Sequence, residues 1–148
     1  MGSDGNVGTT MDMPFKTLSR VSGINLLPDD SILLHTHGVH TGSLTLNDVC
    51  GDKEHNVVVS AYDTRSGRRQ LAHIDAVDRA WGVCLNNFSN VKLSRLMMTA
   101  NGGAEDDSLP VHSLMRYGVL VKVSREGTFG NIKMEQLNVK DMFFKGKQ

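Results

Sequence analysis

The chain has 148 residues, of which 39% are apolar and 22% are charged, as is typical of one domain with its own buried core. Its 16 basic and 16 acidic side chains cancel, so no net positive field favours nucleic acid or an anionic membrane. The apolar runs, such as Leu96-Met97-Met98, are far shorter than the ~20 residues that cross a bilayer. Composition therefore predicts a protein that binds neither nucleic acid nor membrane.

The first twelve residues are mostly Gly, Ser, Asp, Asn and Thr, without the basic and then apolar pattern of a secretory signal. We interpret residues 1–12 as a flexible leader and residues 13–148 as a single domain. The chain has only two cysteines, Cys50 and Cys84, which is too few for a disulfide framework and fits a reducing compartment. A cytoplasmic location is expected.

Short segments that are bounded by turn residues and alternate in part between apolar and polar side chains favour strands. Such segments span residues 31–37, 43–46, 57–63, 69–74, 91–100 and 119–124, and two more strands are expected near the C-terminus. The turn between the third and fourth segments contains Gly67, and glycine supplies the positive φ that a chain reversal needs. Residues 57–74 are therefore predicted to form an antiparallel hairpin.

Two helices are predicted after the hairpin. From residue 75 onward, apolar side chains recur at helical spacing, and they would bury the thiol of Cys84. These side chains are Val77, Ala80, Trp81, Cys84 and Phe88. A second helix is expected from Asp107 or Ser108, either of which can cap it, to Gly118, with Pro110 in its first turn. The predicted fold is a mixed α/β (α+β) layered sandwich with largely antiparallel strands and two main helices.

The residues most able to do chemistry are Cys50 and His73. Cys50 lies in a loop after the predicted strand 43–46, and His73 lies near the end of the strand 69–74. If these strands are neighbours, the imidazole can withdraw the proton of the thiol, and the thiolate is the nucleophile. The alternative is an inert thiol beside a hydrogen-bonding histidine, and the residues alone leave both open.

A longer pattern surrounds this pair. Val57-Val58-Val59-Ser60-Ala61-Tyr62-Asp63, a Gly-containing turn and Leu71-Ala72-His73 resemble the cysteine deamidase superfamily that includes CheD. In that family a Cys precedes an apolar strand ending in Asp, and the next strand delivers the catalytic His. Asn101-Gly102-Gly103-Ala104 is similar to the Gly-Gly-Ala of CheD, and His73-Ile74-Asp75-Ala76 resembles the His segment of toxins of the cytotoxic necrotizing factor type. The resemblance covers residues 32–144.

The resemblance implies a deamidase that hydrolyses a glutamine or asparagine side chain of a partner protein, without a cofactor. Cys50 would attack the amide, and His73 would first accept the thiol proton and then help ammonia leave. Backbone N–H groups around Cys50 would stabilise the oxyanion, with Thr45 or Ser43 as a supporting hydroxyl. The residues expected to contact the substrate are Asn56, Gly51 and Asp75.

The match has one departure. When His73 is aligned without gaps, the position of the CheD nucleophile falls on Asn56, and Cys50 lies six residues upstream. Either the inserted loop 51–55 brings Cys50 over the strand end, or the domain is a catalytically inactive protein-binding module on the same fold.

A third hypothesis is metal binding by His35, His37 and His40. Alternate residues of a strand share one face, and neutral imidazoles suit zinc, copper or nickel. Exposed histidines on a strand edge are the alternative interpretation of the same pattern. The deamidase, the inactive binding module and the metal-binding domain are therefore three hypotheses for the structure to test.

Overall fold

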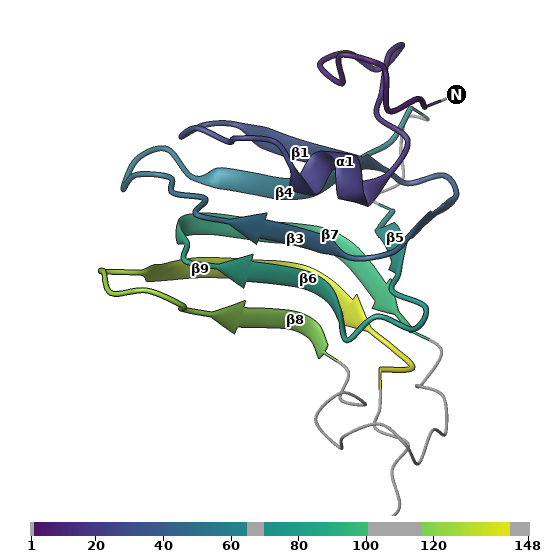
Figure 1. The fold of residues 1–148 in the computed structure, drawn as a ribbon. Coiled ribbons are helices and arrows are strands. Elements are labelled where there is room, and N and C mark those ends of the chain that lie inside the picture. Colours follow the sequence, from purple (N-terminus) through teal and green to yellow (C-terminus); the bar gives the residue numbers. More distant parts are fainter. Residues whose placement is uncertain (1, 65–69, 101–116, 143–148) are drawn as a thin grey trace, which may run out of the picture.

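The computed structural model describes residues 2–64, 70–100 and 117–142, and within these ranges the regular structure is almost entirely β (Figure 1). The elements in chain order are α1 (Leu18–Ser22), β1 (Ser31–His35), β2 (Val39–Thr41), β3 (Leu44–Asn47), β4 (Val57–Tyr62), β5 (Ala72–Asp75), β6 (Trp81–Asn86), β7 (Ser89–Thr99), β8 (Tyr117–Lys122) and β9 (Gly130–Val139). Within the same ranges, no helix is long and apolar enough to cross a membrane.

Among the described residues, the strands pair only in parallel, and none pairs with its neighbour in sequence. One sheet has the order β1-β4-β7-β5-β2, with β9 also on β7, and the other has the order β3-β6-β8. Figure 1 shows β1, β4, β7 and β9 descending behind β3, β6 and β8. The chain therefore winds as a solenoid, in which each coil lies on the previous one, and this is the pattern of a parallel β-helix.

The larger sheet bends into two faces in the middle of β7. The first half of β7 pairs with β4 and belongs to the first face. The second half of β7 pairs with β5 and belongs to the second face. Between them, Arg95 has a φ of 57°, and Gln136 has a φ of 52° at the same place in β9. This left-handed conformation is uncommon for residues with a side chain, and it turns the strand at the corner. The Arg95 guanidinium donates to the carbonyls of Ala61 (2.8 Å) and Gln70 (3.0 Å), which satisfies backbone groups of the coil before it.

The core is the interior of the solenoid. Alternate strand residues point inward, and the parallel register stacks them on the corresponding residues of the next coil. On the first face, Val59 stacks on Leu93, and both are fully buried. The three-stranded sheet β3-β6-β8 forms the third face, where Leu44 and Leu46 stack on Val83 and Leu85 with at most 1% exposure. Stacked aliphatic columns, rather than packed helices, therefore bury the apolar surface.

Helix α1 covers the first end of this interior (Figure 1). Thr17 caps the helix by accepting from the backbone N–H of Arg20, and Leu18 and Val21 are buried in the core. The Ser22 hydroxyl accepts from the backbone N–H of Thr45, so the helix uses a donor on the free edge of β3. The apolar side of a five-residue helix thus closes the first coil.

The predicted layered α/β sandwich with antiparallel strands and two main helices is wrong. The segment predicted as the first helix forms β6 instead, and Cys84 is buried there as expected. Because β6 is buried on both sides, its apolar residues form a nearly continuous run that also fits helical spacing. The predicted hairpin is also wrong, since β4 and β5 both pair with β7 rather than with each other. The second predicted helix lies outside the described residues up to residue 116.

Substitution of Leu93 by Ala tests the stacked core. Leu93 lies between Val59 and Met134 in register, so we expect the free energy of unfolding to fall by about 2–5 kcal/mol. Urea denaturation followed by circular dichroism measures this change. The matched control is Leu33→Ala on the exposed side of β1, where Leu33 is 50% exposed and the expected change is within about 0.5 kcal/mol. If both variants lost the same free energy of unfolding, the assignment of Leu93 to the interior and of Leu33 to the outer surface would be contradicted.

Candidate functional site

The structure places Cys50 and His73 on different faces of the solenoid. Cys50 is exposed and forms an isolated parallel bridge with Ser89, at the start of β7. His73 lies on β5 and is aligned with Met97, in the second half of β7. Ser89 and Met97 are eight residues apart, which corresponds to roughly 26 Å along an extended strand. The bend at Arg95 shortens this path, but the register does not bring the thiol and the imidazole together as attack on an amide requires.

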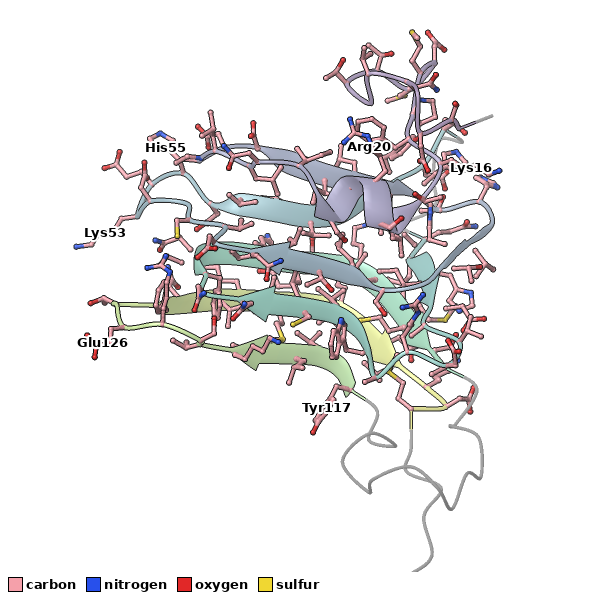
Figure 2. The ribbon with its side chains drawn as sticks, viewed as in Figure 1. Lys16, Arg20, Lys53, His55, Tyr117 and Glu126 are labelled. Carbon is pink, nitrogen blue, oxygen red and sulfur yellow. The ribbon has the colours of Figure 1, made fainter. Side chains whose placement is uncertain are left out.

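The loop after Cys50 has its own hydrogen bonds. One carboxylate oxygen of Asp52 accepts from the backbone N–H groups of Glu54 (2.9 Å) and His55 (2.8 Å) and lies 2.9 Å from His55 Nδ1. The hydrogen bond with the imidazole lowers the pKa of Asp52 and raises that of His55, to which nearby Asp29 also contributes. Residues 52–55 therefore form a closed turn, and the imidazole nearest to Cys50 in sequence, that of His55 (Figure 2), pairs with Asp52.

The supporting residues expected from the sequence are also dispersed. Thr45 lies on β3, and its hydroxyl accepts from Trp81 Nε1 at 3.1 Å, while Ser43 donates to the carbonyl of Trp81 at 2.6 Å. Asn56 precedes β4 and is half-buried. A Cβ on Gly51 would lie 2.6 Å from two backbone oxygens, so this glycine allows a close approach of the chain. The deamidase function stays a prediction, and the α/β sandwich that the CheD resemblance implied for it is not the fold.

The three histidines considered for metal binding gather at the corner between β1 and β2. His35 Nδ1 accepts from the backbone N–H of His37, and the His35 ring meets the edge of Tyr62 at 5.0 Å. His37 Nε2 lies 3.2 Å from a carboxylate oxygen of Asp63, and His40 Nε2 donates to the carbonyl of His35 at 2.9 Å. Ring nitrogens of all three histidines are thus engaged within the protein. In the described parts of the chain, no three His, Cys, Asp or Glu side chains are grouped so that they could hold a metal ion.

A second polar group lies on the outward side of β2, β5 and the second half of β7, which we call the polar face. Ala72 and Ile74 are fully buried, so the alternate residues His73 and Asp75 point outward. His73 Nε2 is hydrogen-bonded to the hydroxyl of Thr99 at 2.7 Å, although the two residues are 26 positions apart in sequence. The polar face comprises Thr41, His73, Asp75 and Thr99, with Val39 and Met97 beside His73 in register.

Sequence reasoning singled out His73 and Asp75 but missed their neighbours Thr41 and Thr99. Register joins Thr41, Asp75 and Thr99 in one row across three strands. Asp75 also accepts from the backbone N–H of Val77 at 3.0 Å, which orients its carboxylate at the strand end. The sequence signal for these neighbours was the alternation in residues 72–75 and 96–99. In both segments every second residue is buried, and the residue that follows it is polar or long.

Comparison with known proteins identifies the fold. No family model and no curated protein matches the chain. Among solved structures, the GH136 lacto-N-biosidase from Eubacterium ramulus is similar over 97% of this chain, both as the selenomethionine derivative (TM-score 0.79, 24% identity) and as the native protein (TM-score 0.78, 23% identity). The chain spans 26% of the length of that enzyme. At this identity the likeness concerns the fold, and the chain resembles a section of the glycosidase.

The two cysteines offer a test of the deamidase hypothesis. Burial raises the pKa of the Cys84 thiol, which lowers its thiolate fraction at neutral pH, whereas Cys50 is exposed. We expect one thiol per chain to react with iodoacetamide in the folded protein at the rate of a free cysteine, and the second thiol to react only after unfolding. Mass spectrometry of the labelled peptides identifies each site, and Cys50→Ser serves as the control. Labelling of Cys50 much faster than free cysteine, and slowed by His73→Ala, would favour the deamidase instead.

Proposed function

We propose that the chain is a section of parallel β-helix that binds a neutral oligosaccharide on the polar face. The observation that carries the proposal is the outward-facing pair of His73 and Thr99, hydrogen-bonded across β5 and β7 and flanked by Asp75. An imidazole, hydroxyls and a carboxylate supply both donors and acceptors to sugar hydroxyl groups. The likeness to a glycosidase supports a carbohydrate as the ligand.

The spacing and charge of the face suit such a ligand. Neighbouring strands of a sheet lie about 4.8 Å apart, so a linear oligosaccharide that crosses the strands meets a new row of side chains at each coil. Met97 and the 53% exposed Val39 place apolar atoms beside His73, where the C–H side of a sugar ring can pack. The formal net charge of zero gives no general attraction for polyanions, which favours a neutral sugar chain.

The chemistry of the face supports binding rather than hydrolysis. Glycosidases typically use two carboxyl groups about 5–9.5 Å apart on either side of the scissile bond. Within the described residues, Asp75 is the one carboxylate in register on the polar face. Asp63 follows β4, outside the residues of the polar face, and lies 3.2 Å from His37 Nε2. The proposed role is therefore recognition of a glycan.

The test is titration of the chain with lacto-N-biose, the disaccharide for which the similar glycosidase is named, and with oligosaccharides that contain it. We expect weak binding with a Kd near the millimolar range, since a few surface hydrogen bonds offset only part of the cost of association. His73→Ala and Thr99→Val should each weaken binding by about tenfold, because each removes hydrogen bonds to the ligand and to the other residue. Isothermal titration calorimetry or chemical-shift changes measure the affinity.

Matched controls are available elsewhere on the surface. His55→Ala and Thr128→Val make the same changes at exposed residues outside the polar face, and they should leave the affinity unchanged. Urea denaturation of each variant confirms that the fold is retained. The proposal fails if no oligosaccharide binds the intact chain, or if the polar-face variants bind as well as these controls do.

A further inference from the structure

His55 lies where the first coil of the solenoid meets the second. β1 pairs with β4 from Ser31 and Val58 onward, and the backbone N–H of Val58 also donates to the carbonyl of Asp30 at 3.1 Å. His55 lies shortly before β4, and Asp29 lies shortly before β1. The contact between the His55 imidazole and the Asp29 carboxylate is therefore just beyond the first paired residues of the two coils.

Two carboxylates face the His55 imidazole through its two nitrogens. Nδ1 lies 2.9 Å and 3.0 Å from the two carboxylate oxygens of Asp52, in the same turn. Nε2 lies 3.8 Å from a carboxylate oxygen of Asp29, in the turn before β1. The hydrogen bond with Asp52 and the negative charge of Asp29 both raise the pKa of His55. The imidazole thus lies between an acid of the first coil and an acid of the second.

The other charged groups nearby have different positions or partners. The Asp30 carboxylate accepts from the backbone N–H of Leu27 at 2.7 Å. Lys53 and Glu54 are exposed in the same turn as His55, and Figure 2 shows the Lys53 side chain extending away from His55. The two strands that begin here, β1 and β4, start with uncharged residues. The charge on the imidazole is therefore controlled by the two carboxylates that face it.

The number of N–H groups on the ring decides how many carboxylates it can bind. An imidazolium carries a hydrogen on both nitrogens, so it can donate to Asp52 and attract Asp29 at the same time. A neutral imidazole carries one N–H. Because the contact with Asp52 is the shorter one, the neutral ring keeps its hydrogen on Nδ1. The lone pair of Nε2 then faces an anionic oxygen of Asp29, and the attraction between the two coils is lost.

We propose that His55 is a proton-dependent bridge between the first two coils, in which the imidazolium binds Asp52 and Asp29, and loss of its proton releases the turn 27–30. The turn 52–55 stays closed in both states, because the backbone N–H groups that donate to Asp52 do not titrate. In the described sheet order β1 is a terminal strand. The bridge therefore controls how readily the start of this strand separates from β4.

The directions of the two pKa shifts give the pH range of the bridge. Its carboxylate partners raise the pKa of His55 above 6.5, so the stabilisation is fully present below 6.5 and is lost as the pH rises through the folded value. The hydrogen bond with His55 lowers the pKa of Asp52 below 3.8, so the stabilisation is also lost as the pH falls through that lower value. The bridge is closed in mildly acidic solution and open in alkaline solution.

An NMR titration of the imidazole nitrogens in the 148-residue chain, from about pH 5 to about pH 9, tests the bridge. We expect the pKa of His55 to be above 6.5 and the neutral ring to carry its hydrogen on Nδ1. Asp29→Asn and Asp52→Asn should each lower this pKa, since each removes a charge that favours the imidazolium. The matched control is Asp12→Asn, which makes the same change at an exposed residue before α1 and should leave the pKa unchanged.

Hydrogen exchange of the Val58 backbone N–H measures the release, because its hydrogen bond to Asp30 lies beside the bridge. Relative to the unfolded chain at the same pH, we expect exchange to become about two- to threefold faster when His55 loses its proton, as for the loss of an exposed ion pair. The internal control is the Thr36 N–H, which donates to Tyr62 at the other end of the same strand pair and should not change. His55→Gln should abolish the pH dependence.

Three results would each overturn the proposal. The first is a His55 pKa of 6.5 or lower in the folded chain. The second is a pKa that falls in Asp52→Asn but not in Asp29→Asn, because the imidazole would then contact its own turn without linking the coils. The third is exchange of the Val58 N–H at the same relative rate above and below the pKa of His55.

Discussion

In-register stacking of apolar side chains between successive coils is the interaction on which the rest of this structure depends. A single coil encloses only a ring of aliphatic groups. Water is excluded from each ring only when another ring lies above it and another below it. The column of Val59, Leu93 and Met134 shows the principle, because its upper members are fully buried while its last member is half exposed. The ends of the solenoid therefore need a cap or a partner, and α1 provides the first cap.

The corners decide which polar residues can meet. The left-handed backbone conformation of Arg95 turns β7 from the first face to the second, and β7 pairs with β9 on both sides of this residue. This turn separates Cys50, at the start of the first face, from His73 on the second. The same parallel register brings His73 and Thr99 into contact across 26 residues of sequence. Which polar side chains meet on the surface therefore depends on the face they lie on and on the register between coils, and not on which loops are close in sequence.

The outer surface and the interior of the solenoid have separate roles in this arrangement. Outward-pointing residues do not contribute to the aliphatic columns, so the polar face can carry hydrogen-bonding side chains without disturbing the core. The apolar residues at the end of the solenoid are core residues by position, and their exposure follows from the absence of another coil among the described residues. The glycan binding that we propose for the polar face therefore makes no demand on the residues that form the core.

The sequence by itself determined the positions of most strands, because alternation of apolar and polar residues is a local property. It also indicated that Cys84 is buried, although the helix on which that prediction was based is strand β6 in the structure. It did not determine how the strands pair, since parallel and antiparallel strands show the same alternation. The segment of β6 fits helical spacing as well, and only burial on both of its sides identifies it as a strand. Sequence pointed to His73 and Asp75 but not to Thr41 or Thr99, because their neighbourhood depends on register between coils. Tertiary structure alone decided that register, since it is set by stacking between residues far apart in the chain.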